Sequence, residues 1–250
     1  MWKQILIGCC IFLNICLMSA RAENSATDRS AGGDKAGALQ YLSNFAIVLS
    51  RPDGATGNIE TCGAFQWIDV PAQHARYYIS LAHCNEYMPM GDTSMLIGRD
   101  VLYVAKGESG VALRIEPLCE KPVPATLMPK ALNPNSPYFV IVFKEDTFGS
   151  VAPYAMQLKL RSGDINNAIY EMTETAEGVH FIPGLMISDD NGKAASISVA
   201  MISSETPDQP SFILGAGTRS HFDVMVKAAK AFKGFTEAER DKFCKSLRQP

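Results

Sequence analysis

The residues of this chain best suited to chemistry stand together at 77–87, in the stretch YYISLAHCNEY. The imidazole of His83 follows a run rich in aromatic and β-branched residues, which is typical of a strand, and Cys84 comes directly after it. An imidazole at the end of a strand is a candidate general base or metal ligand, because its pKa lies near neutrality. Its role depends on the state of Cys84 and on whether a nucleophile stands elsewhere in the chain.

The first residues predict the redox environment of that cysteine. Residues 1–22 begin with MWKQ, continue with the apolar run ILIGCCIFLNICLMS and end in the small residues ARA. This pattern predicts a signal peptide cleaved after Ala22, and an uncleaved anchor is the alternative. The apolar run is short for a membrane span. We therefore expect export to a periplasm or to the medium, where disulfides persist.

Four cysteines remain after this cleavage, and an even number in an exported chain indicates disulfides. The only turn-forming stretch between Cys62 and Cys84 is PAQH at 71–74, which lies at their midpoint. A hairpin with this turn places the two cysteines opposite each other, within reach of a disulfide. We predict the pair Cys62–Cys84 and, by elimination, the pair Cys119–Cys244.

Short apolar runs fill most of the remaining chain, among them NFAIVLS, RYYISL, YFVIVFK and SFILGAG, with turn signals such as RPDG and DDNGK between them. Many short strands at close spacing predict an all-β sandwich or barrel. Residues 23–37 are polar and rich in small residues, and are predicted to be a flexible leader. Only the end has helical spacing, in SHFDVMVKAAKAF and in TEAERDKFCKSL, where Thr236 is the expected cap.

The composition is that of an ordinary globular protein, with 47% hydrophobic residues, 20% charged residues and a formal net charge of −3. No dense cluster of Lys and Arg is present, which argues against a nucleic-acid partner. We expect no cofactor and no membrane span after signal cleavage.

A Cys-Gly pair, a hairpin and the pattern hydrophobic-x-Ala-His-Cys resemble the chymotrypsin/trypsin-like serine peptidases. The matching residues are Cys62-Gly63 and 81–84, and the resemblance implies that His83 is the general base. It also implies a double six-stranded β-barrel over residues 38–250, divided near 145–155, with a C-terminal helix that closes the second barrel. The stretch IPGLMISDDNGKAASISVAMIS is similar to the family segment that carries the serine nucleophile.

The orienting carboxylate of that family does not stand where the resemblance places it. It is expected at the head of the YFVIVFK strand, where the chain has Ser136, Pro137 and Tyr138. Asp146 lies past the strand. Loss of this acid alone costs about 10⁴ in turnover in the worked triad.

The nucleophile is also missing at its expected place, two residues after Gly184, where Met186 stands. Ser188 is the nearest hydroxyl, but two aspartates follow it, and their charges oppose an oxyanion. A second match to the family's GDSGG, Glu108-Ser109-Gly110, precedes the expected interbarrel strand and has the composition of a hairpin turn.

The other histidines suggest no second site. His74 lies in the predicted turn, and His180 and His221 lie at strand and helix positions that are more often structural. A zinc site would need reduced thiols, which an exporting compartment disfavours. The residues considered for it are His74, His83, Cys62 and Cys84.

The sequence therefore predicts an exported trypsin-like protein with a degenerate triad, which binds a peptide or protein in an interbarrel cleft without cleaving it. The alternative is an active secreted serine endopeptidase, in which Ser188 or another unaligned serine acts with His83. A third interpretation is a β-sandwich adhesin or carbohydrate-binding module.

Overall fold

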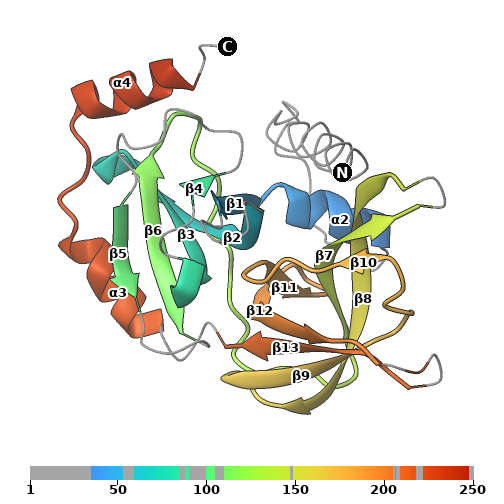
Figure 1. Ribbon diagram of the computed structural model, residues 1–250. Coiled ribbons are helices and arrows are strands. Elements are labelled where there is room, and N and C mark those ends of the chain that lie inside the picture. The colour runs from blue at the N-terminus through green and yellow to red at the C-terminus, as the bar shows by residue number, and fades with distance from the viewer. Residues whose placement is uncertain are drawn as a thin grey trace.

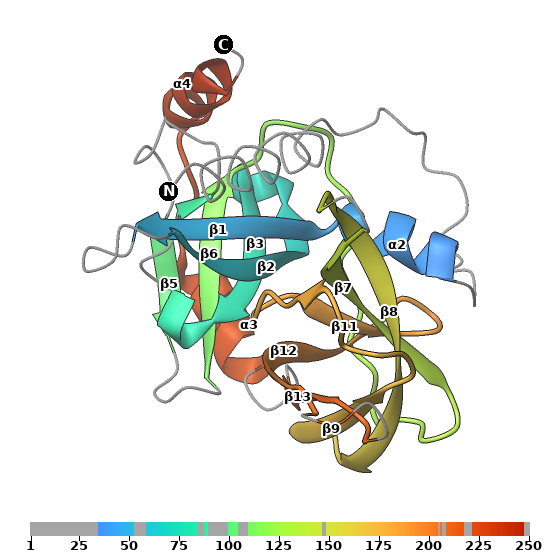
Figure 2. The same ribbon diagram turned by 45° about the vertical axis from the view of Figure 1, so that its right-hand side comes forward.

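Two antiparallel β-sheets make up most of the protein (Figures 1 and 2). The computed structural model describes residues 35–52, 59–84, 88–89, 100–104, 110–146, 149–204, 206, 209–217 and 222–247. The predicted signal peptide and the expected cleavage site at Ala22 lie outside these residues. None of the helices in the described part has the length and apolar character needed to cross a bilayer.

The N-terminal sheet has the strand order β4-β1-β2-β3-β6-β5. Its strands are β1 (Ala46–Pro52), β2 (Ile59–Val70), β3 (Ala75–Leu81), β4 (Met88–Pro89), β5 (Asp100–Val104) and β6 (Val111–Pro117). Every residue of β3 is buried, because its two faces are covered by different parts of the fold. A strand buried on both faces reads as a continuous apolar run, as RYYISL does apart from Arg76 and Ser80.

The second sheet has the order β10-β7-β11-β12-β13-β9-β8, and a further pairing of β7 with β8 closes six of its strands into a barrel. We call this unit the C-terminal barrel. Its strands are β7 (Pro137–Glu145), β8 (Val151–Gly163), β9 (Asn167–Met172), β10 (Val179–His180), β11 (Met186–Asp189), β12 (Ala194–Ile202) and β13 (Phe212–Ala216). Because β7 already belongs to this barrel, the chain passes between the sheets within 118–136, earlier than the predicted division near 145–155.

The hairpin of β2 and β3 turns where the sequence predicts it. A 3-10 turn, η1 (Pro71–Gln73), follows β2, and His74 adopts a left-handed conformation with φ 48° before β3 begins. The predicted register is wrong, however. Next to the turn the pairing is already offset by one residue, with Val70 opposite Ala75, and it shifts again between Gln66 and Ile68, at Trp67. Trp67 is buried in the core, and a single extra residue of this kind changes every later cross-strand partner.

Helix α2 (Lys35–Ser43) precedes β1 and packs on β7, β8 and β1, so it joins the two sheets (Figure 2). It buries Ala38 and Leu42, which are spaced by one helical turn. The Tyr41 hydroxyl donates a hydrogen bond to the Gly192 carbonyl in the β11–β12 turn. Residues 35–37 of the predicted flexible leader are helical, and residues 23–34 lie outside the described residues.

Two helices end the chain, α3 (Phe222–Ala231) and α4 (Glu237–Ser246), and Thr236 forms the expected capping box with Glu239. They pack on β5 and β6 of the N-terminal sheet, and not on the second barrel as predicted (Figure 1). The side-chain amide of Gln73 donates to the carbonyls of Ala229 and Phe232 at the end of α3, while the backbone carbonyl of Gln73 accepts from Phe235 N–H. The hairpin tip thus supplies the partners that a helix end lacks.

Candidate functional site

His83 lies in a short 3-10 turn, η2 (Ala82–Cys84), at the end of β3. Its side chain is exposed while both neighbours in the turn are buried. Ala82 N–H donates to the Gly110 carbonyl, and the buried guanidinium of Arg114 donates to the Cys84 carbonyl at 3.0 Å. These bonds fix the backbone on each side of His83 and present its imidazole to the outside of the strand.

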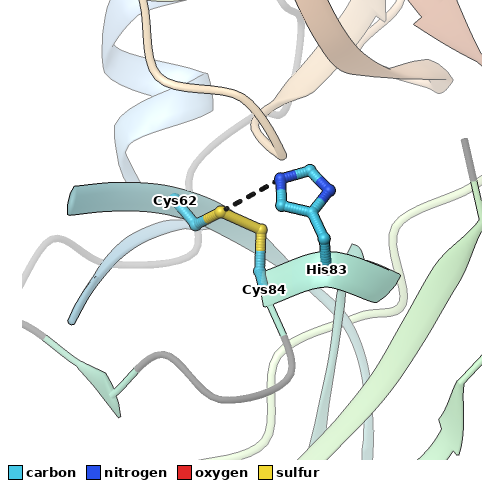
Figure 3. A group of neighbouring side chains, drawn as sticks. All are labelled: Cys62, His83 and Cys84. Carbon is cyan, nitrogen blue, oxygen red and sulfur yellow. Dashed lines mark hydrogen bonds between the residues drawn. A yellow bond between two sulfur atoms is a disulfide. The ribbon is translucent and has the colours of Figure 1, made fainter. Parts of the chain in front are cut away.

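The predicted Cys62–Cys84 disulfide is present, with a Cα–Cα distance of 6.0 Å (Figure 3). The bond joins β2 to the η2 turn and not two opposed strand positions, because β3 ends at Leu81 and the pairing of β2 with β3 is offset from the predicted register. The His83 ring leans over this disulfide, with Nε2 3.7 Å from Cys62 Sγ. Among the described residues, the ring makes no other polar contact.

Cys62, His83 and Cys84 place their possible ligand atoms within 4.8 Å of one another. The two sulfurs are bonded to each other, so neither is a thiolate that binds a metal. His74, the fourth residue considered for zinc, lies at the opposite end of the hairpin, where its Nδ1 is 3.5 Å from a nitrogen of Arg240. The structure does not bring this set together.

A loop of the C-terminal barrel reaches toward the imidazole, as the tan ribbon above the ring shows in Figure 3. Gly63 N–H donates to the Pro183 carbonyl at 2.6 Å, one residue from the sulfur that the ring contacts. A side chain on Gly184, whose φ is +94°, would overlap the Gly63 carbonyl oxygen, and one on Gly63 would meet Leu185 at 2.5 Å. Both glycines are required for this close approach of sheet and barrel.

That loop presents few groups for chemistry. Ile182, next to Pro183, is apolar and 6% exposed. Pro183 has no backbone N–H. Gly184 N–H is bound to the Ser198 carbonyl at 2.6 Å. Beyond it, Leu185 is buried at the position before β11 begins.

Ser188, the serine proposed as an alternative nucleophile, lies within β11 and is 1% exposed. Its hydroxyl has no hydrogen-bond partner among the described residues. It pairs with Phe139 of β7 inside the barrel wall. Burial of this kind keeps a hydroxyl away from a peptide bond in solution.

The strand expected to carry the acid belongs to the C-terminal barrel and not to the sheet that holds His83. YFVIVFK is β7 of the C-terminal barrel, and Asp146 lies in its hairpin turn, where it accepts from Ser150 N–H. The strand beside β3 is β6, which begins next to Gly110, the residue bonded to Ala82. Glu108 and Ser109 directly precede Gly110 in the sequence and lie outside the described residues.

The remaining histidines stand apart from this site. His180 lies in β10, with Nε2 3.5 Å from Glu145. His221 lies outside the described residues. The second predicted disulfide, Cys119–Cys244, is present and ties the end of the N-terminal sheet to α4, with a Cα–Cα distance of 5.4 Å.

No protein-family model matches this sequence, and no curated protein matches it. Its fold is similar to that of the Rv3671c protease from M. tuberculosis in its active form, with a TM-score of 0.50 and 12% identity over 87% of this chain and 96% of that one. The chain has a trypsin-like serine peptidase fold. A serine endoprotease from Yersinia pestis is also similar, with a TM-score of 0.45 and 11% identity over 77% of this chain and 67% of that one.

This fold confirms the all-β class predicted from the sequence. The turn with His83 lies at the junction of the two units and faces the loop that contains Ile182 and Pro183. The sequence around Pro183 contains no sign of the contact between Gly63 and Gly184 that joins the two units. The need for a positive φ and for the absence of a Cβ becomes evident only when both glycines are seen together in the fold.

Proposed function

We propose that this protein is an exported, non-catalytic relative of trypsin-like peptidases that binds extended peptide segments at the junction of its two units. The observation that carries the proposal is the loop opposite His83. It offers an isoleucine, a proline and a glycine whose N–H is already bonded, and none of these three residues carries a hydroxyl. A general base without nucleophile or oxyanion donors has little value for peptide hydrolysis, because these groups act as a unit.

Export is supported by the two disulfides, which persist in oxidising compartments. The apolar N-terminal sequence with its ARA ending adds a separate argument from residue types. We therefore place the protein in a periplasm or outside the cell.

Peptide binding is supported by the edge of β12. On the β11 side, the pairing of β12 ends at Ile197, whereas on the β13 side it continues to Ile202. Among the described strands, none pairs with the β11 side of residues 199–202, which leaves backbone groups for strand addition. β12 also contacts β3, the strand that ends next to His83.

The side chains of this edge favour apolar segments. Residues 199–202 are Val, Ala, Met and Ile, and Ile202 is 51% exposed. An exposed apolar residue on an unpaired edge gains from burial by a partner strand, by about 1.5–3 kcal/mol for a side chain of this size.

One probe separates binding from hydrolysis. Fluorescein-labelled casein, which is unfolded and rich in extended segments, is mixed with the protein. We expect fluorescence polarisation to rise with protein concentration while the casein remains intact on a gel. Release of fragments would overturn the non-catalytic assignment, and unchanged polarisation would overturn peptide binding.

Two matched variants sharpen this test. Ile202→Asp should weaken casein binding about tenfold or more, because it places a charge on the proposed edge. Ile169→Asp changes an exposed isoleucine of β9, 39% exposed, and should leave binding unaltered. Labelling by a fluorophosphonate probe that disappears in His83→Ala would establish the active peptidase instead.

A further inference from the structure

The two disulfides of this protein differ in their access to solvent. Cys62 and Cys84 are 1% and 0% exposed. Cys119 and Cys244 are only partly buried. Both line an open hollow of about 470 Å³ between the end of β6 and α4.

The hollow matters because thiol–disulfide exchange requires direct approach of the attacking sulfur to a disulfide sulfur. Its other walls come from the turn at Pro71 and His74 and from Arg240 and Asp241 of α4. A small thiol that enters the hollow meets the Cys119–Cys244 bond without any change in the strands. The buried bond can be reached only after the η2 turn opens.

The partly buried Cys119–Cys244 bond is also a main attachment of α4. Phe243 is the only buried side chain of that helix. Across the hollow, Arg240 approaches His74 at 3.5 Å, and most of the remaining polar contacts of the helix lie within the helix itself. In contrast, α3 buries Met225 and Ala229 and is held at its end by the Gln73 amide.

We propose that Cys119–Cys244 is a thiol–disulfide exchange site for an external dithiol, and that its opening releases α4 while both sheets stay folded. This inference stands on the second disulfide and is independent of the proposed peptide binding.

The exchange is balanced as follows. A thiolate of the dithiol attacks one cysteine sulfur, the Cys119–Cys244 bond breaks, and the other cysteine leaves as a thiolate. The second thiol of the reagent, as a thiolate, then attacks the reagent sulfur of the mixed disulfide, and the protein cysteine leaves as a thiolate. The protein gains two electrons and two protons as two thiols, and the dithiol becomes a disulfide.

The test uses the unaltered chain. After timed exposure to dithiothreitol, free thiols are alkylated and their positions are determined by peptide mass spectrometry. We expect Cys119 and Cys244 to be labelled at least about tenfold faster than Cys62 and Cys84. Equal rates for the two pairs, or faster labelling of the buried pair, would overturn the proposal.

Release of α4 has its own measurement. Trypsin cleavage after Arg240, Lys242 and Lys245 should accelerate at least about tenfold once the bond is open, as expected for a helix that loses its covalent anchor. Cleavage after Lys227 and Lys230 of α3 is the internal control and should not change. Unchanged cleavage within α4, or acceleration in both helices with loss of the β-sheet circular dichroism, would show that the bond is not a latch for α4 alone.

Discussion

The N-terminal sheet and the C-terminal barrel contribute very unequally to their junction. The sheet holds His83 with a buried disulfide, one backbone hydrogen bond from Ala82 to Gly110 and the guanidinium of Arg114. The barrel offers Ile182 and Pro183, an apolar side chain and a residue without N–H. The comparison shows that the contacts that hold the imidazole come from the sheet itself and do not depend on the side chains of the facing loop.

The contact between the two units gives the largest expected effect. Gly184→Ala should lower the free energy of unfolding by at least about 3 kcal/mol, because the new methyl group collides with the Gly63 carbonyl and φ is +94°. Urea denaturation measures this. Gly149→Ala is the matched control, since its φ is +80° but its nearest neighbour is 3.5 Å away, and it should cost about 1 kcal/mol. Equal costs would show that the two units do not depend on this contact.

The disulfide that supports His83 should come next. Cys62→Ser/Cys84→Ser should lower stability by about 3 kcal/mol, because a bond between residues 22 apart restricts the unfolded chain. Thermal unfolding under oxidising conditions measures the change. If the variant and the unaltered protein had the same midpoint, the bond would not support the hairpin.

A smaller effect concerns α2, which joins the two units. Burial raises the pKa of Glu174, but hydrogen bonds from Lys35 and Tyr154 lower it more, so the net pKa lies below the ordinary value of 4.5. Because the pKa is lowered, the contacts of Glu174 with Lys35 and Tyr154 stabilise the fold fully above pH 4.5. This stabilisation is lost as the pH falls through the pKa of Glu174 in the folded protein. Hydrogen exchange of the α2 amides, corrected for intrinsic rates, should therefore show weaker protection once the pH falls below the ordinary glutamate value of 4.5 and through the lowered pKa of Glu174.

Glu174→Gln is the control for this titration. It should show the reduced protection of α2 already at neutral pH, without a further step on acidification. A step of the same size in this variant would assign the effect to another carboxylate.

The smallest effect is expected at Ser188. Ser188→Ala removes a buried hydroxyl that has no partner among the described residues, so stability should change by no more than about 0.5 kcal/mol. Fluorophosphonate labelling should be the same in both proteins. Labelling that is lost in this variant would make the C-terminal barrel a catalytic partner of the imidazole after all.

Local features of the molecule were predictable from the sequence. The turn at 71–74, the Cys62–Cys84 bond and the Thr236 cap depend on residues close in the chain or on a simple spacing. The register was not predictable, because the shift at Trp67 depends on how an indole fits the core.

Non-local features account for the other errors. YFVIVFK was assigned beside the His83 hairpin, since an apolar run has the same pattern in either unit. The terminal helices were placed on the wrong sheet for the same reason. The sequence contains no signal for the Gly63–Gly184 contact. Glycines are common in turns, and this pair differs from the others only in the close approach of the two backbones in the fold.

The hydrogen bonds between Gln73 and the end of α3 affect when the N-terminal sheet can complete its folding. The hairpin tip accepts a hydrogen bond from Phe235 N–H and donates to the carbonyls at 229 and 232, so the N-terminal sheet obtains these partners from a segment that begins 156 residues after Gln73. During translation, this sheet therefore becomes fully native only after that segment has left the ribosome.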